Sequence, residues 1–254
     1  MKLSEADKDI HGHRHLKKEI LELLSAKDFD QSLRTLELMP AHQVANVLLS
    51  FLPNTDLKIK WPAVTAIGSV VAKLADKEME SARDIMRRLM WQLNEESGGI
   101  GWGCPETMGE IMACHEGLAI EYSHMLISYL MVEGNYLEYE PLQQGVLWGL
   151  GRLAQIRPHL IQDAVPHLMP FLDAKDGTLK ALAAWALGLL GAEKARRKIE
   201  SLAMDETEIE IYVDRALKTW LLKDLAKEAL KRIKDIQAKK KEVKQHYLQG
   251  EQNP

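Results

Sequence analysis

The chain has 254 residues, of which 46% are apolar and 28% are charged, and its formal net charge at pH 7 is −4. This length corresponds to one large domain or two small ones, with enough apolar material for a core. The composition excludes a disordered chain and a collagen-like fibre. The longest apolar run, Ala181–Ala192, has 12 residues, fewer than the ~18–20 needed to cross a bilayer.

The amino-terminal sequence and the cysteine content indicate a cytoplasmic location. The first nine residues contain no apolar core segment, so we expect no secretory signal. The sequence has two cysteines, Cys104 and Cys114, too few for a disulfide framework.

Amphipathic segments with the 3.6-residue period of a helix follow one another along the chain. Their apolar stripes are 16–24, 44–51, 85–93 and 161–171. Turn-forming residues separate the stripes, and no Asn-Gly or Asp-Gly pair joins two alternating apolar and polar runs. We therefore expect an all-α chain of antiparallel helices joined by short turns.

An apolar residue followed by glycine recurs within small-residue-rich helices. The glycines are Gly68, Gly109, Gly151 and Gly188, at spacings of 41, 42 and 37 residues. A tryptophan precedes each glycine by seven or three residues: Trp61, Trp102, Trp148 and Trp185. Both offsets place the indole on roughly the same helix face as the glycine.

Each of these helices is followed by a second apolar segment, at about 78–93, 117–131, 158–172 and 193–203. A fifth, degenerate copy is expected from Glu208, with Ala216-Leu217-Lys218 in place of the glycine triplet. A glycine inside a helix costs about 1 kcal/mol relative to alanine. Its recurrence therefore predicts that a neighbouring helix packs directly on the glycine backbone.

Periods near 40 residues with two helices each are typical of α-solenoids. The segment from Lys180 to Gly191, with the second helix and Asp205 that follow, resembles a HEAT repeat, and is most similar to the HEAT-like variety also found in phycobilin lyases. The resemblance is better over 144–222 than over 61–132. We predict a right-handed α-solenoid of about five hairpins, in one continuous domain: an amino-terminal cap (1–55), the repeats (56–222), and a capping helix with a basic tail (223–254).

The segment Glu95–Glu110 is unusually rich in glycine, with four glycines between Gly98 and Gly103. A phosphate cradle is disfavoured because no strand precedes it, no lysine follows, and Glu106 and Glu110 would repel an anion. Two interpretations stay open. The glycines allow a tight turn that sets Trp102 against a neighbouring repeat, or they form a loop that meets a ligand or partner.

Charge is unevenly distributed along the sequence. Between Leu89 and Gly151 there are nine glutamates and no lysine or arginine, whereas Lys223–Lys244 has nine basic residues and four acidic ones. These stretches are either solvated faces or, in the middle, an acidic surface that attracts a basic partner. The middle repeats are unsuited to nucleic acid, because such binding requires cations that pair with phosphates.

Candidate metal ligands are few and poorly arranged. Glu106, Glu110 and Cys114 share one helix face, where a single stripe offers at most two adjacent ligands. His11, His13 and His15 near the amino terminus are better read as a polar lead-in than as a metal site. No nucleophile or zinc-hydrolase motif occurs. We therefore assign no catalytic residue, no metal and no cofactor, and the question of an enzyme stays open.

The function favoured by the sequence is a non-catalytic protein–protein interaction or scaffold module. Its concave surface would present four residues to a protein partner with a basic surface or to a basic peptide. These residues are Trp61, Trp102, Glu106 and Glu110. Two alternatives remain. A HEAT-like DNA alkylation-repair glycosylase is favoured by the resemblance, by tryptophans that could stack on a base and by an available carboxylate, and is disfavoured by the lack of cations in the middle of the chain; release of alkylated bases tests it. A lyase-type chaperone for a prosthetic group is implied by the resemblance alone and is tested by absorbance.

Overall fold

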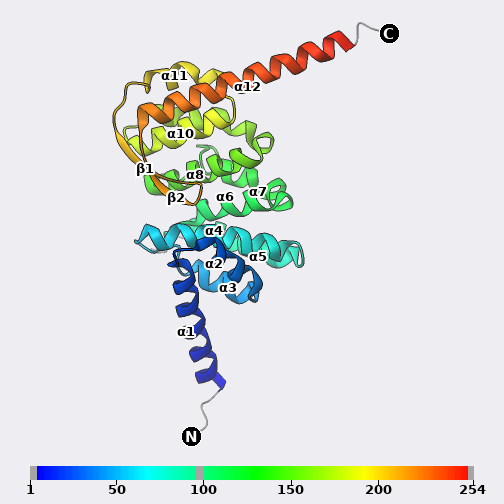
Figure 1. The fold of residues 1–254 in the computed structure, drawn as a ribbon, viewed down its shortest axis with the longest axis vertical. Coiled ribbons are helices and arrows are strands. Elements are labelled where there is room, and N and C mark those ends of the chain that lie inside the picture. Colours follow the sequence, from blue (N-terminus) through cyan, green and yellow to red (C-terminus); the bar gives the residue numbers. More distant parts are fainter. Residues whose placement is uncertain (1–4, 95–99, 251–254) are drawn as a thin grey trace. The chain divides into compact units, whose positions relative to one another are not determined.

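The computed structural model describes residues 5–94 and 100–250 (Figure 1). Among these residues there are twelve α-helices, three short 3₁₀ helices and one two-stranded antiparallel sheet. The chain divides into two compact units, Met1–Tyr122 and Ser123–Pro254. The predicted all-α fold class is confirmed, with one local exception in the second unit. The predicted boundaries at residues 55 and 222 stay a prediction.

The first unit is entirely helical over its described residues. Its helices are α1 (Glu5–Leu24), α2 (Phe29–Leu38), α3 (Ala41–Leu49), α4 (Leu57–Ala75), α5 (Met79–Leu93), α6 (Cys104–Cys114) and the first half of α7 (Glu116–Ser128). Side chains that end in a carboxylate cap two of them: Asp28 accepts from the Gln31 amide, and Asp56 from the Lys58 amide, each at 2.9 Å. These caps satisfy backbone donors that have no partner inside the helix.

Helix α4 is the centre of the first unit, packed against α3, α5 and α6. Its apolar side chains are buried together with those of the neighbouring helices, including Ile67, Met86 and Met108 at 0% exposure. At Gly68, a Cβ would stand 2.5 Å from Cγ of Glu110 on α6. The glycine therefore allows α6 to approach the backbone of α4, as the repeat predicts.

The second unit contains the rest of α7 and five further α-helices. These are α8 (Glu140–Ile156), α9 (Val165–Leu168), α10 (Gly177–Leu189), α11 (Arg196–Ser201) and α12 (Leu222–Gly250). Its 3₁₀ helices are Pro158–Ala164, Met169–Asp173 and Glu193–Ala195, and its strands are β1 (Glu208–Val213) and β2 (Ala216–Leu221).

Helix α10 lies between α8 and α12 and is buried along most of its length. A Cβ at Gly151 on α8 would stand 2.2 Å from the Trp185 ring, and one at Gly188 on α10 would stand 2.7 Å from Cα of Ala229 on α12. At both glycines, the next helix of the stack therefore packs directly on the glycine backbone. The predicted reason for the recurring glycines is confirmed at Gly68, Gly151 and Gly188.

The second helices of the later repeats are less regular than predicted. The segment expected as one helix over 158–172 consists of two 3₁₀ helices on either side of the four-residue α9. Prolines 158, 166 and 170 each lack a backbone N–H, and this prevents a continuous α-helical ladder. The segment expected over 193–203 is likewise a 3₁₀ turn followed by the six-residue α11.

The predicted fifth helical copy is wrong in its first half, because residues 208–221 form a β-hairpin. Strand β1 pairs with β2 from Glu208↔Leu221 to Val213↔Ala216. The two turn residues, Asp214 and Arg215, have positive φ values of 53° and 61°, the conformation of a type I′ turn. Helix α12 then begins directly at Leu222, close to the predicted start of the carboxy-terminal helix.

Candidate interaction surface

The amino-terminal end of α6 positions two of the predicted partner-binding residues. Gly103 precedes the helix with a φ of 75°, and Pro105 occupies its first turn. A Cβ at Gly103 would meet Leu52 at 3.1 Å, so glycine is needed both for the left-handed backbone and for the close approach. These contacts favour the turn interpretation for this glycine. Gly98 and Gly99 lie outside the described residues.

Glu106 is buried and paired with a cation from α4. Its Oε1 accepts a hydrogen bond from Lys60 Nζ at 2.7 Å, and the two side chains are only 7% and 15% exposed. The same ammonium lies 5.3 Å from the centre of the Trp61 ring. The pair therefore links α4 to α6, and the ring adds a cation–π contact to it.

Glu110 is also buried, at 5% exposure, where α6 packs against α4 at Gly68. Cys114 Sγ lies 3.7 Å from its Oε1, one helical turn further along. The expectation that Glu106 and Glu110 project from a surface needs correction, because both side chains lie in helix–helix packing. Trp61 and Trp102 are half-buried. The partner-binding role of all four residues stays a prediction.

Cys104 starts α6 and is a buried thiol. Its Sγ lies 3.0 Å from Gln92 Oε1 on α5. Burial, followed by the nearby charge of Glu106, raises the pKa of the Cys104 thiol to about 12. A thiol with this pKa is not a nucleophile near neutral pH, so the structure gives Cys104 a packing role.

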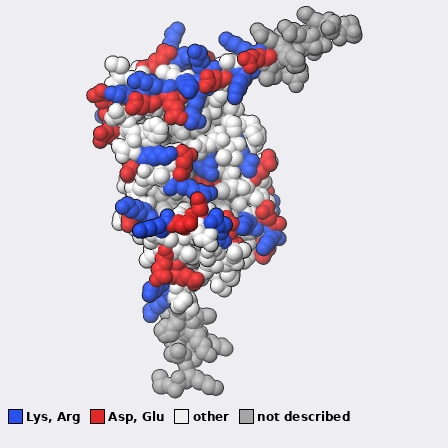
Figure 2. All heavy atoms as spheres, viewed as in Figure 1, with Lys and Arg blue, Asp and Glu red and all other residues white. Residues whose placement is uncertain are grey.

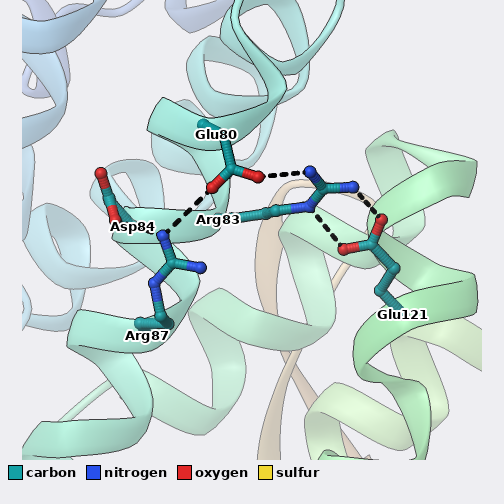
Figure 3. A network of polar contacts seen from close by, with 5 residues as sticks. All are labelled: Glu80, Arg83, Asp84, Arg87 and Glu121. Atoms are coloured by element: carbon teal, nitrogen blue, oxygen red, sulfur yellow. Dashed lines mark hydrogen bonds and ion pairs between the residues drawn. The ribbon is translucent and has the colours of Figure 1, made fainter.

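A second ion-pair network joins α5 to α7 (Figure 3). Arg83 donates from Nε and Nη2 to the two carboxylate oxygens of Glu121, at 2.8 and 2.6 Å, and from Nη1 to Glu80 at 2.5 Å. Arg87 contacts Glu80 at 3.4 Å and also pairs with Asp84. The hydrogen bonds from Arg83 lower the pKa of Glu121 and of Glu80.

These pairs reduce the negative charge of the stretch between Leu89 and Gly151, which contains no lysine or arginine of its own. Glu106 and Glu121 are neutralised by Lys60 and Arg83, which come from earlier helices. On the face drawn in Figure 2, the described acidic side chains lie among basic ones. The negative charge of the stretch is therefore partly cancelled within the fold.

Three further glutamates of the stretch remain exposed in a segment that we call the acidic loop, residues 132–140 of the second unit. They are Glu133, Glu138 and Glu140. Within the described parts of the chain, none of the three has an ion pair. Exposed apolar and aromatic side chains alternate with them: Val132 at 79%, Tyr136 at 39% and Tyr139 at 48% exposure.

The acidic loop is held in one conformation by hydrogen bonds to the elements that flank it. The amides of Asn135 and Leu137 donate to the carbonyl oxygens of Ser128 and Tyr129, both at 3.1 Å. The Gln143 side-chain amide on α8 donates to Leu137 O at 2.7 Å and to Tyr136 Oη at 3.0 Å. The loop therefore presents its carboxylates and rings from a fixed backbone.

A groove of about 190 Å³ lies between α3 and α5 in the first unit. It is lined by His42, Asn46, Ser81, Asp84, Ile85 and Arg88. Its polar groups have partners within the fold: Arg88 donates to Asn46 Oδ1 at 2.7 Å, and His42 Nε2 lies 3.0 Å from Oε2 of Glu78, which does not line the groove. We assign no chemistry to it. No group of three or more His, Cys, Asp or Glu side chains among the described residues is arranged to hold a metal ion.

Two exposed features were missed by sequence reasoning. Trp91 on α5 is 72% exposed, and its position between the buried Leu89 and Leu93 is the signal that places it on the opposite helix face. The tyrosines of the acidic loop were also not named. Their proximity to glutamates in a segment without a helical period was visible in the sequence.

Comparison with known proteins identifies the type of repeat. The model of the HEAT-like repeat family matches residues 140–190, which span α8 to the end of α10. An uncharacterised protein of Archaeoglobus fulgidus is 27% identical over 170 residues, which are 65% of this chain and 84% of that protein. No helix in the described parts of the chain has the length and hydropathy of a membrane span.

Solved structures similar to this chain include engineered repeat proteins. One engineered protein has a TM-score of 0.45 at 17% identity and covers 87% of this chain and 97% of its own. A designed armadillo repeat protein has a TM-score of 0.45 at 15% identity, with coverages of 86% and 99%.

The stacked helices of each unit define a helical repeat protein. The family match at 140–190 shows a HEAT-like repeat in the second unit, in agreement with the resemblance of residues 180–191. The similarity to the phycobilin-lyase variety stays a prediction.

Proposed function

We propose that this protein is a non-catalytic interaction module whose acidic loop binds a basic segment of a protein partner. A single observation carries the proposal: three exposed glutamates alternate with exposed aromatic and apolar side chains on a hydrogen-bonded loop. Repeat proteins of this fold commonly mediate protein interactions, and the loop supplies a surface suited to that role.

The chemistry of the acidic loop fits lysine and arginine side chains. The carboxylates accelerate encounter with a cationic partner and fix its orientation. Tyr136 and Tyr139 offer large contact area with few rotatable bonds and can stack against a guanidinium or ammonium group. Because the loop is already ordered by Gln143, binding does not have to offset the entropy of ordering it.

The four residues named from the sequence enter this proposal differently. Glu106 and Glu110 are each 5% exposed and support the packing of α6 on α4, and their partner-binding role stays a prediction. Trp61 and Trp102 are half-buried, and their partner-binding role stays a prediction. The glycosylase and prosthetic-group chaperone alternatives stay predictions.

The proposal is tested by fluorescence anisotropy with a labelled peptide of Lys, Arg and Gly, and with a matched peptide in which Glu replaces each basic residue. We expect the full chain to bind the basic peptide only. The triple variant E133Q/E138Q/E140Q should bind it about tenfold more weakly, since each exposed pair contributes up to about 1 kcal/mol.

A matched control removes the same charge from exposed positions elsewhere in the second unit, as E200Q/E208Q/E210Q. This variant should bind like the unmodified chain. An equal loss of affinity in both triple variants would show that only net charge matters, and would contradict the proposal, as would absence of binding by the unmodified chain.

A further inference from the structure

The β-hairpin leaves one strand edge open. In a two-residue hairpin the residues flanking the turn form a hydrogen-bonded pair, and such pairs alternate with non-bonded ones. Here Val213↔Ala216, Ile211↔Lys218 and Ile209↔Trp220 are the bonded pairs, given the register. The backbone N–H and C=O groups of Leu217 and Thr219 therefore point away from β1.

Hydrogen bonds at the ends of the hairpin support this assignment. Trp148 Nε1 on α8 donates to Tyr212 O at 2.7 Å, so the carbonyl of Tyr212 points away from β2. The Leu222 amide donates to Thr207 O at 3.0 Å, which continues the alternation beyond the strands. The outer edge of β1 is thus occupied at Tyr212.

The outer edge of β2 has no such partner among the residues that the structure describes. In the described residues, no backbone hydrogen bond reaches Leu217 or Thr219 from that side, and Thr219 is exposed. The indole Nε1 of the adjacent Trp220 is buried and has no hydrogen-bond partner among the described residues. An unpaired strand edge is a template for addition of another strand.

We propose that β2 pairs with β2 of a second copy of this chain, antiparallel about a two-fold axis at Thr219, to form a four-stranded sheet. In that register the sequence of β2 is self-complementary. Leu217 faces Leu221 of the second copy, Lys218 faces Trp220, and Thr219 faces Thr219. Leucine pairs, threonine pairs and a cation over an indole are all favourable cross-strand neighbours.

The neighbouring register is disfavoured by charge. An axis at Lys218 would set two lysines directly opposite each other, which destabilises a strand pair. In the proposed register Lys218 keeps its contact with Asp214, at 2.8 Å, on its own chain. A two-fold interface of this kind is closed, because each copy uses the same edge.

The test is a charge exchange at Thr219, measured on the full chain by analytical ultracentrifugation. T219K and T219E each place like charges opposite each other at the axis, so each variant should dimerise about tenfold more weakly than the unmodified chain. An equimolar mixture of the two should form a heterodimer as tight as the original, since opposite charges then meet.

Matched controls at an exposed residue of α3, Q43K and Q43E, should leave dimerisation unchanged. Hydrogen exchange gives an independent readout, since the Thr219 amide should exchange slowly only at concentrations where the dimer forms. If a Thr219 variant does not fold, as judged by circular dichroism, K218E serves in its place because it sets a carboxylate against the Trp220 face.

Three results would overturn the proposal. The unmodified chain stays monomeric at every concentration up to about 100 µM, roughly where a micromolar dimer is saturated. Alternatively, it dimerises but T219K and T219E do not weaken the dimer, or the mixture of T219K and T219E fails to associate. None of these results bears on the acidic loop, so this proposal and the proposed function fail separately.

Discussion

Trp185 on α10 lies directly over Gly151 on α8, so closely that a Cβ at residue 151 would stand 2.2 Å from ring atom Cζ3. The tryptophan of one repeat thus occupies the space left by the glycine of the preceding repeat. Gly188 and Ala229 repeat the relationship between α10 and α12 at 2.7 Å. Glycine and its helical neighbour therefore act as a pair in the stacking of the second unit.

Replacing either glycine with alanine should destabilise the protein. We expect G151A and G188A to lower the free energy of unfolding by about 1–3 kcal/mol, the usual cost of overpacking. G188A should have the larger effect, since its added methyl meets the backbone of Ala229 rather than a side chain. Urea unfolding followed by tryptophan fluorescence and circular dichroism measures both.

Gly12 provides the control, because a Cβ there would meet no atom within 4 Å. G12A, at an exposed position of α1, should leave stability unchanged or raise it by up to about 1 kcal/mol. A G151A protein as stable as G12A would show that the glycine contact does not matter.

The stacking of helices was predictable because it has a local signature. A glycine inside a helix is costly, and its return at intervals near 40 residues indicates a repeated close approach. Sequence spacing assigns residues such as Trp185 and Ala229 to successive repeats. It does not predict that these residues contact the glycines of the preceding repeats. The structure supplies those distances.

The hairpin was missed for a physical reason. The run Glu208-Ile209-Glu210-Ile211 alternates as a strand does, but the turn is Asp214-Arg215, and arginine rarely adopts a positive φ. Sequence reasoning required glycine at that turn and therefore extended the helical repeat. The ion pair of Glu106 and Lys60 was also missed. The two residues are 46 positions apart in the sequence, so counting charges within one segment does not reveal the pair.

The buried pair of Lys60 and Glu106 should show strong coupling. K60M leaves the Glu106 carboxylate buried without its cation and should destabilise the protein by about 3 kcal/mol. The double variant K60M/E106Q should be more stable than K60M alone, because no unpaired charge remains. Chemical denaturation of the single and double variants measures the coupling, and additive effects would contradict this description.

The two cysteines should differ in reactivity. Cys114 is exposed, whereas Cys104 is buried with its pKa raised to about 12. At pH 8 we expect Ellman's reagent to modify one thiol per native chain and both thiols in guanidinium chloride. C114S should abolish the native-state reaction and C104S should not. Rapid native-state modification of Cys104 would disprove the burial.

The pair of Arg83 and Glu121 should make stability depend on pH in the acidic range. Arg83 lowers the pKa of Glu121 from its ordinary value of 4.5. As the pH falls, Glu121 therefore takes up a proton in the unfolded chain before it does so in the folded chain. The stabilisation from the pair is present above pH 4.5 and is lost as the pH falls through the lower pKa of Glu121 in the folded state. E121Q should have a slightly lower melting temperature than the unmodified chain at pH 7, with the difference disappearing at lower pH.

A second variant for this comparison is R83M, which removes the same pair from the other side together with the ion pair of Arg83 and Glu80. Its difference from the unmodified chain should shrink over the same acidic range. A difference that stays constant between pH 7 and pH 3 would assign the effect to packing instead of charge.

The location of partner binding is the central claim, and hydrogen exchange with mass spectrometry tests it most directly. The full chain is compared with and without the labelled Lys, Arg and Gly peptide. We predict slower exchange over residues 129–143, which contain the acidic loop and Gln143, and no change over α4 and α6. Protection confined to α4 and α6, with none at the acidic loop, would contradict the account.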